Sequence, residues 1–186
     1  VFSIGQFDII PGGMPYIIAE IGVNHENSMD RAYKLIEQAK EGGAHAAKFQ
    51  SYKARTLASK YSPAYWDTTK EKTLSQRELF EKYDSFGESE YIQLASHCKD
   101  VEIDFLSTPF DIQSADFLET LNCCYKIASA DLTNIPLLRR IASKGKPVIL
   151  STGASTIGEI DIAVSTLEAS GCSSIALLHC VLNYPT

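Results

Sequence analysis

The sequence lacks the patterns that mark membrane-spanning, secreted and nucleic-acid-binding proteins. No apolar run approaches the roughly 18 residues of a membrane span, and residues 1–15 have neither the basic region nor the long apolar core of a signal peptide. No run of lysine or arginine is present, and the net charge of −6 disfavours polyanionic partners. We therefore expect a cytoplasmic protein that binds neither nucleic acid nor membrane.

Metal-ligand and phosphate-loop motifs are also missing. The five cysteines have no C-x-x-C or other zinc-ligand spacing, and the adjacent Cys123 and Cys124 suit a disulfide framework poorly, so we expect reduced structural thiols. Neither G-x-G-x-x-G nor G-x-x-x-x-G-K-S/T occurs. The sequence therefore lacks the signatures of the two commonest phosphate-binding loops of open α/β sheets.

What the sequence does contain is one unit repeated along the chain. Short apolar runs alternate with longer segments of helical period. The expected strands are 16–22, 44–52, 103–110, 125–129, 147–153 and 174–180, and the expected helices are 28–41, 88–99, 112–121, 136–143 and 157–170. Continuously apolar strands joined by helical crossovers predict an α/β fold with a covered parallel sheet.

The missing phosphate loops favour a (β/α)8 TIM barrel over an open sheet. Six β/α units are two fewer than a closed barrel needs, so we expect the chain to be part of a longer protein. Residues 1–15, which contain Pro-Gly-Gly at 11–13, are predicted to form a β-hairpin lead-in, and residues 16–186 a partial TIM-barrel domain.

Polar side chains follow the C-terminal end of every predicted strand, where a barrel carries its active site. Lys48 and Lys126 lie within apolar runs, where lysine is rare unless it is paired. Two interpretations stay open: an ion pair with a carboxylate of a neighbouring strand, such as Glu20, or a bound anion. Strand alternation places Lys48 and Gln50 on one side and directs Phe49 toward the helices.

Hydroxyl groups accompany the two lysines at the predicted strand ends. Thr108, Ser129 and Ser151 carry them, and the run Ser-Thr-Gly at 151–153 adds backbone N–H groups. Ammonium, hydroxyl and backbone N–H groups together predict a site for phosphate and carboxylate on one small ligand.

Six motifs occur in a fixed order, namely IAEIGVNHENSMDRA, AAKFQSYKA, FLSTPFD, YKIAS, GKPVILSTGAS and LLHCVLNYPT. In this order they resemble the sialic acid synthase family, whose members condense phosphoenolpyruvate with N-acetylmannosamine or a related amino sugar. The products are a sialic-acid-like nonulosonic acid and phosphate. The resemblance runs from Tyr16 to Thr186.

The resemblance implies a role for individual residues. Glu20 and Asp131 are the implied catalytic carboxylates, although Asp131 stands where many members have glutamate. Leu182 stands where some members have asparagine, with Asn183 adjacent. The implied phosphoenolpyruvate-binding residues are Lys48, Gln50, Thr108, Lys126, Ser129, Ser151 and Tyr184.

The resemblance also implies a larger assembly. Members have a TIM barrel followed by a small antifreeze-like domain that closes over the partner subunit's active site, which implies a homodimer when full length. Their divalent metal, Mn2+ or Mg2+, is held by two histidines of the seventh and eighth strands, which would lie beyond Thr186. Within this chain, His25 and His179 are the alternative metal ligands.

Two other functions are compatible with the same residues. One is a Schiff-base aldolase on a TIM barrel, with Lys48 or Lys126 as nucleophile. The other is a catalytically silent barrel that binds a sugar phosphate or serves as a scaffold, which the change at Asp131 would favour.

Overall fold

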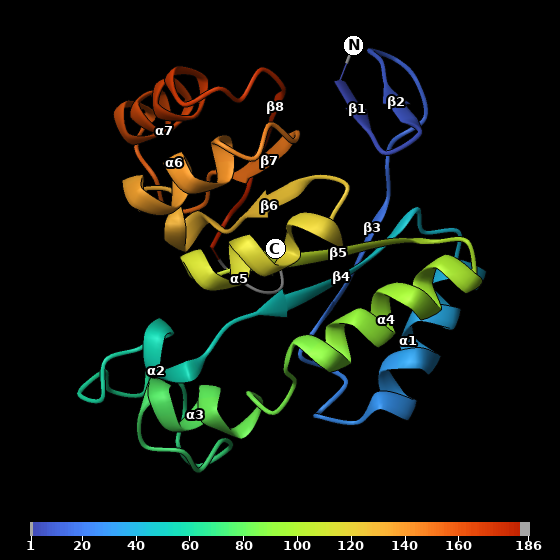
Figure 1. Ribbon diagram of the computed structural model, residues 1–186. Helices are drawn as coiled ribbons and strands as arrows, with labels where there is room; N and C mark the ends of the chain where they lie inside the picture. Colours follow the sequence, from blue (N-terminus) through green and yellow to red (C-terminus); the bar gives the residue numbers. More distant parts are fainter. Residues whose placement is uncertain (1, 183–186) are drawn as a thin grey trace.

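The computed structural model describes residues 2–182 and confirms an α/β fold with parallel strands. An antiparallel hairpin of β1 (Phe2–Ile4) and β2 (Phe7–Ile9) comes first (Figure 1). The parallel strands follow as β3 (Ile18–Gly22), β4 (Ala46–Ser51), β5 (Asp104–Pro109), β6 (Tyr125–Ile127), β7 (Val148–Ser151) and β8 (Ile175–Leu178). Backbone ladders join β3, β4 and β5 into one group and β6, β7 and β8 into another.

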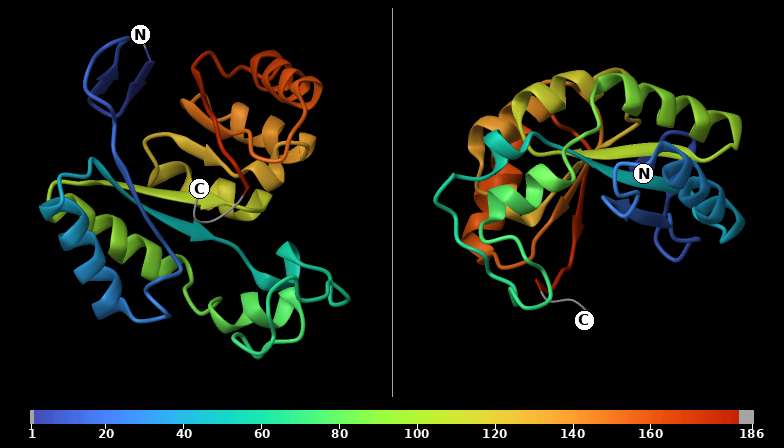
Figure 2. Two further views of the ribbon diagram at one scale, coloured as in Figure 1. Left: turned by 180° about the vertical axis from the view of Figure 1, so that it is seen from behind. Right: turned by 90° about the horizontal axis from the view of Figure 1, so that it is seen from below.

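Helices follow the strands as the periodicity predicts. They are α1 (Met29–Glu41), α4 (Glu88–Asp100), α5 (Ile112–Phe117) with the 3-10 turn η1 (Leu118–Thr120), α6 (Ile135–Ala142) and α7 (Ile157–Ala169). Ser28 caps α1 by accepting a hydrogen bond from the Arg31 N–H. The right-hand view of Figure 2 shows these helices in an arc along the outer side of the strands. No helix in the described part of the chain has the length and hydropathy of a membrane span.

The segment between β4 and α4 carries two short helices that the periodicity does not predict. They are α2 (Ala54–Leu57) and α3 (Gln76–Lys82), and Ser75 caps the second. In Figure 1 this segment projects at the end of the strands opposite the hairpin. It therefore lies on the side where the polar residues of the strands gather.

Strand alternation divides the strand residues into an outer and an inner set. Phe49 is fully buried in the outer core against the helices, as predicted. The inner side chains form two levels. The level at the N-terminal ends is apolar and contains Ile4, Ala46, Leu106, Cys124 and Ile149. The level above it, toward the C-terminal ends, contains Glu20, Lys48, Thr108, Lys126 and Ser151.

The hairpin covers the apolar level. Ile4 of β1 is 1% exposed and packs within that group. Two residues around the hairpin add polar contacts, because the Tyr16 hydroxyl donates to Asp104 Oδ2 at 2.5 Å and the Ile17 N–H donates to His45 Nδ1 at 2.9 Å. The polar level consequently rests on a closed apolar floor.

A side chain replaces part of the ladder between β5 and β6. The two strands are neighbours, but no ladder joins them within residues 2–182. The buried Asn122 amide bridges that gap, since its Oδ1 accepts from the Ser107 N–H at 2.9 Å and its Nδ2 donates to the Ser107 carbonyl at 2.8 Å. Asn122 thus satisfies the two backbone groups that a paired strand would otherwise satisfy.

We predict that Asn122→Ala lowers the free energy of unfolding by about 2–4 kcal/mol, because it leaves two buried backbone groups of Ser107 unpaired. Urea denaturation measures the change. Gln93→Ala, on the exposed face of α4, is the control and should change stability by less than about 0.5 kcal/mol. Equal stability of the two variants would contradict this role of Asn122.

Candidate functional site

A cavity of about 390 Å³ opens above the apolar floor, at the C-terminal ends of the strands. It brings together side chains from β3, β4, β5, β6 and β7, as the pattern of strand ends predicts. Seven of the predicted site residues line it, namely Glu20, Lys48, Gln50, Thr108, Lys126, Ser129 and Ser151. We call it the anion cavity.

Lys48 is 3% exposed and holds its charge beside one carboxylate. Its Nζ lies 2.7 Å from Glu20 Oε2 and donates to Thr108 Oγ1 at 3.2 Å. The strand register places Glu20 directly beside Lys48, which explains the ion pair. The predicted ion pair with a neighbouring strand is therefore confirmed for Lys48. The Glu20 side chain is 61% exposed, so it borders the cavity rather than the core.

Lys126 is 8% exposed and has no carboxylate within ion-pair distance among residues 2–182. Its Nζ donates to the Ile127 carbonyl at 3.0 Å. Burial and, secondly, the positive charge of Lys48 lower the pKa of Lys126 to about 8, while Glu20 acts in the opposite direction. Two ammonium groups and one carboxylate thus share the cavity, an arrangement that an added anion stabilises.

Neutral donors complete the wall of the anion cavity. Thr108, Ser129 and Ser151 contribute hydroxyl groups and Gln50 an amide. Glycine at position 153 keeps the hydroxyl of Ser129 unobstructed, because a Cβ there would lie 3.2 Å from Ser129 Oγ.

Asp131 lies outside the anion cavity. It belongs to the 3-10 turn η2 (Ser129–Asp131) and lines a second cavity of about 400 Å³. Its Oδ1 accepts from Asn134 Nδ2 at 3.1 Å, whereas its buried Oδ2 has no hydrogen-bond partner in the described part of the chain. Burial raises the pKa of Asp131, the hydrogen bond from Asn134 acts in the opposite direction, and the nearby charge of Asp111 adds to the effect of burial. The two predicted catalytic carboxylates, Glu20 and Asp131, are thus divided between adjacent cavities.

The remaining predicted positions make no metal centre. His25 is buried and stacked on Phe86, its Nδ1 accepts from the Asn27 N–H, and burial lowers its pKa to about 4. His179 is exposed at the end of β8. Residues 2–182 contain no cluster of three or more histidine, cysteine or carboxylate side chains that could hold a metal ion. Tyr184 and Asn183 lie outside the described residues.

The sequence profile of the NeuB family matches residues 35–186. The chain belongs to the NeuB family. This confirms the resemblance to sialic acid synthases that the six motifs indicate.

Named relatives of this family are similar over almost the whole chain. The N,N'-diacetyllegionaminic acid synthase of Campylobacter jejuni is 42% identical over 91% of this chain and 52% of its own length. The N-acetylneuraminate-9-phosphate synthase of Drosophila melanogaster is 38% identical over 96% of this chain and 49% of its own length. The chain therefore spans about half the length of the curated relatives it matches.

A solved NeuB-type structure has the same fold. It is the N-acetylneuraminic acid (sialic acid) synthetase of Leptospira borgpetersenii serovar Hardjo-bovis in complex with citrate. It superposes with a TM-score of 0.83 at 32% identity, over 99% of this chain and 60% of that chain. The α/β fold of the present chain is thus that of a sialic acid synthase.

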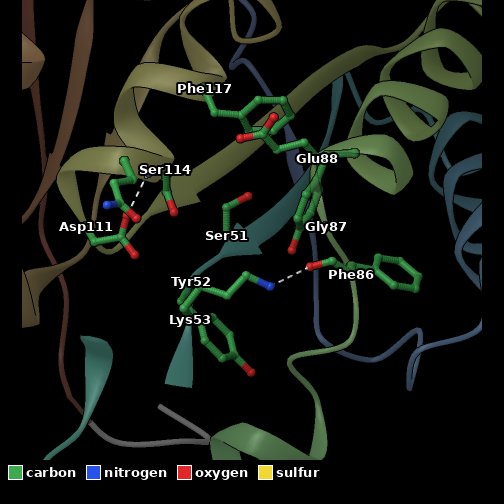
Figure 3. Close-up of a pocket in the computed structure, with 11 residues that line it drawn as sticks. Ser51, Tyr52, Lys53, Phe86, Gly87, Glu88, Asp111, Ser114 and Phe117 are labelled. Atoms are coloured by element: carbon green, nitrogen blue, oxygen red, sulfur yellow. Dashed lines mark hydrogen bonds between the residues drawn. The ribbon is translucent and has the colours of Figure 1, made fainter. Parts of the chain in front are cut away.

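A third, small cavity of about 100 Å³ lies between β4, α4 and α5 (Figure 3) and shares no lining residue with the anion cavity. Two of its charged side chains make structural contacts. The Lys53 ammonium donates to the Phe86 carbonyl at 3.1 Å, and Asp111 caps α5 by accepting from the Ser114 N–H at 2.6 Å. We therefore assign it no part in the family's chemistry.

Several cavity residues are not predicted by the sequence analysis. Phe110 and Val23 line both the anion cavity and the second cavity, and Leu57, Leu79 and Phe80 line the second. The helical spacing of the apolar residues at 79, 80 and 83 is the available signal, but it does not indicate which part of the molecule they face.

We predict that the affinity of the anion cavity for sulfate, whose charge is constant in this range, falls about tenfold between pH 7 and pH 9. The reason is that Lys126 is charged below its pKa of about 8 and neutral above it. Titration calorimetry measures the affinity. Lys126→Ala should bind sulfate more weakly and without this pH dependence, and a pH-independent affinity of the unmodified protein would contradict the prediction.

Proposed function

We propose that this chain carries the phosphoenolpyruvate-binding half of a nonulosonic acid synthase, which condenses phosphoenolpyruvate with an N-acetylated amino sugar such as N-acetylmannosamine or a relative. The observation that carries the proposal is the pair of buried lysines in the anion cavity, of which Lys126 has no carboxylate partner within residues 2–182. A ligand with a phosphate and a carboxylate satisfies both ammonium groups.

The residues of the cavity supply a fixed electrostatic environment. Lys48 and Lys126 hold the phosphate and carboxylate of phosphoenolpyruvate, and the hydroxyls of Thr108, Ser129 and Ser151 donate to their oxygens. The substrate anion replaces Glu20 as the partner of Lys48. Glu20, which is largely exposed, is then available to accept a hydrogen bond from the sugar.

The reaction forms a bond between C3 of phosphoenolpyruvate and the aldehyde carbon of the open-chain sugar, whose oxygen takes up a proton and becomes a hydroxyl. Water adds its oxygen to C2 and loses a proton. The C2–O bond to phosphate then breaks as the new C2 hydroxyl gives its remaining proton to the departing phosphate, which leaves a C2 ketone and inorganic phosphate. Glu20 and Asp131 are the carboxyl groups that we propose for hydrogen bonding and proton transfer to the sugar.

The complete enzyme requires more than the described residues. We propose that residues 16–186, preceded by the lead-in 1–15, supply six of the eight units of a TIM barrel, and that a homodimer with a C-terminal antifreeze-like domain completes the site. A divalent ion, Mn2+ or Mg2+, would be bound by residues outside 2–182, since those residues offer no cluster that fits it. The five free cysteines are compatible with a reducing, cytoplasmic location.

In a full-length protein containing this chain, Lys48→Ala and Lys126→Ala are each predicted to weaken phosphoenolpyruvate binding by at least about 30-fold, because each removes a buried charge from the anion. The affinity for the amino sugar should change far less. Titration calorimetry gives both affinities, and phosphate release with phosphoenolpyruvate, Mn2+ and the sugar gives the activity.

Lys34→Ala, on the exposed face of α1, is the matched control for both lysine variants and should retain binding and activity. Unchanged affinity for phosphoenolpyruvate in both Lys48→Ala and Lys126→Ala would remove the basis of the proposal. If the protein binds phosphoenolpyruvate but releases no phosphate when the sugar is added, the alternative of a catalytically silent binding protein is supported instead.

A Schiff-base aldolase is the second candidate, and the lowered pKa of Lys126 is the observation that favours it. We predict that borohydride with pyruvate leaves the protein unlabelled, because Lys48 and Lys126 bind the substrate by charge rather than covalently. Mass spectrometry detects any adduct. A pyruvyl adduct on Lys126 that is lost in Lys126→Ala would establish the aldolase instead.

A further inference from the structure

The second cavity continues from the anion cavity. The two share Val23, Gln50 and Phe110, so a ligand can extend past these residues from one cavity into the other. Its volume of about 400 Å³ lies within the roughly 300–1,000 Å³ of small-molecule sites. The residues that matter for its chemistry are Gln50, Leu57, Gln76, Leu79, Phe80 and Asp131.

The lining of the second cavity is mainly apolar and contains no lysine, arginine or histidine among the described residues. Two leucines and four aromatic residues are among its lining residues, and its neutral hydrogen-bonding groups are two glutamine amides and the hydroxyls of Tyr52 and Tyr83. Three basic residues of the segment that covers it are held in ion pairs with neighbouring carboxylates, namely Lys53 with Asp84, Arg77 with Glu81 and Lys82 with Glu71. The other four, Arg55, Lys60, Lys70 and Lys72, do not line the cavity.

Asp131 is the one acidic group of the lining. Its unpaired, buried Oδ2 needs an N–H or O–H donor, or else a proton of its own. A hydroxyl or acetamido N–H of a ligand supplies such a donor. A phosphate dianion would instead meet a carboxylate in a largely apolar space where residues 2–182 supply no cation to offset the repulsion.

We infer that the acceptor of this synthase is an uncharged, N-acetylated amino sugar whose far end is apolar, such as a 6-deoxy sugar with two acetamido groups, and is not a sugar 6-phosphate. The inference rests on the proposed function, which places the aldehyde carbon beside phosphoenolpyruvate in the anion cavity. The rest of the open-chain sugar then extends past Phe110, and its methyl groups contact Leu57, Leu79 and Phe80. Since phosphoenolpyruvate adds three carbons, C6 of the acceptor becomes C9 of the product, and we expect that product to carry no 9-phosphate.

Acceptor competition in the full-length protein tests this inference. With phosphoenolpyruvate and Mn2+ saturating, kcat/KM is compared for a 2,4-diacetamido-2,4,6-trideoxyhexose, N-acetylmannosamine and N-acetylmannosamine 6-phosphate. We expect the 6-phosphate to be used at least about 100-fold less well than the deoxy sugar, the effect of one unpaired buried charge. Equal or better use of the 6-phosphate overturns the inference but leaves the synthase proposal intact. No turnover with any of the three overturns both.

A charge placed in the second cavity gives an independent test. Leu79→Arg should shift the ratio of kcat/KM values toward the 6-phosphate by about tenfold or more. Leu74→Arg is the matched control, because Leu74 lies on the same segment, is 72% exposed and does not line the cavity; it should leave the ratio unchanged.

Asp131→Asn retains the shape of the side chain and should shift the ratio in the same direction as Leu79→Arg, which keeps the test valid if Leu79→Arg fails to fold. Circular dichroism establishes the fold of each variant. An unchanged ratio in a folded Leu79→Arg and in Asp131→Asn would show that the far end of the sugar does not occupy the second cavity.

Discussion

Two ammonium groups held on one concave surface are the constraint on which the site depends. Lys48 and Lys126 are both nearly inaccessible to solvent, and only Lys48 has a carboxylate beside it in the described residues. Like charges at low solvent exposure oppose one another, as the lowered pKa of Lys126 indicates. The fold tolerates this arrangement because Glu20 neutralises one charge and the cavity leaves room for a ligand to neutralise the other.

The strands make this charge arrangement possible by separating it from the core. On the inner side, an apolar level closed by Ile4 of the hairpin lies below the polar level, while Phe49 and its neighbours face the helices. The lysine stems therefore contact apolar atoms, and their ammonium groups reach the C-terminal ends of the strands. Where the backbone ladder is interrupted between β5 and β6, the Asn122 amide satisfies the backbone groups of Ser107.

The two cavities differ in chemistry, as the binding of two chemically different ligands in the proposed function requires. The anion cavity is built from strand residues, whose register fixes the positions of charge. The second cavity is closed by the segment of α2 and α3, which projects from the strand ends (Figure 1). Loops on a rigid scaffold vary more readily than strands, so acceptor preference can change within the NeuB fold while the anion cavity stays the same. Asp131, whose buried Oδ2 has no partner within residues 2–182, lies in this second cavity.

The periodicity of the sequence by itself determined the α/β class, the five main helices and the six parallel strands. It also placed Lys48, Lys126, Thr108 and Ser151 at one end of those strands, because alternation and crossover direction are local properties of the chain. Only the tertiary structure decided that Lys48 pairs with Glu20 while Lys126 has no such partner within residues 2–182, since this depends on strand register. Only the tertiary structure placed Asp131 in a separate cavity, beside residues of the segment 57–83. That segment has no strong hydrophobic periodicity, and packing between residues far apart in the chain sets its position.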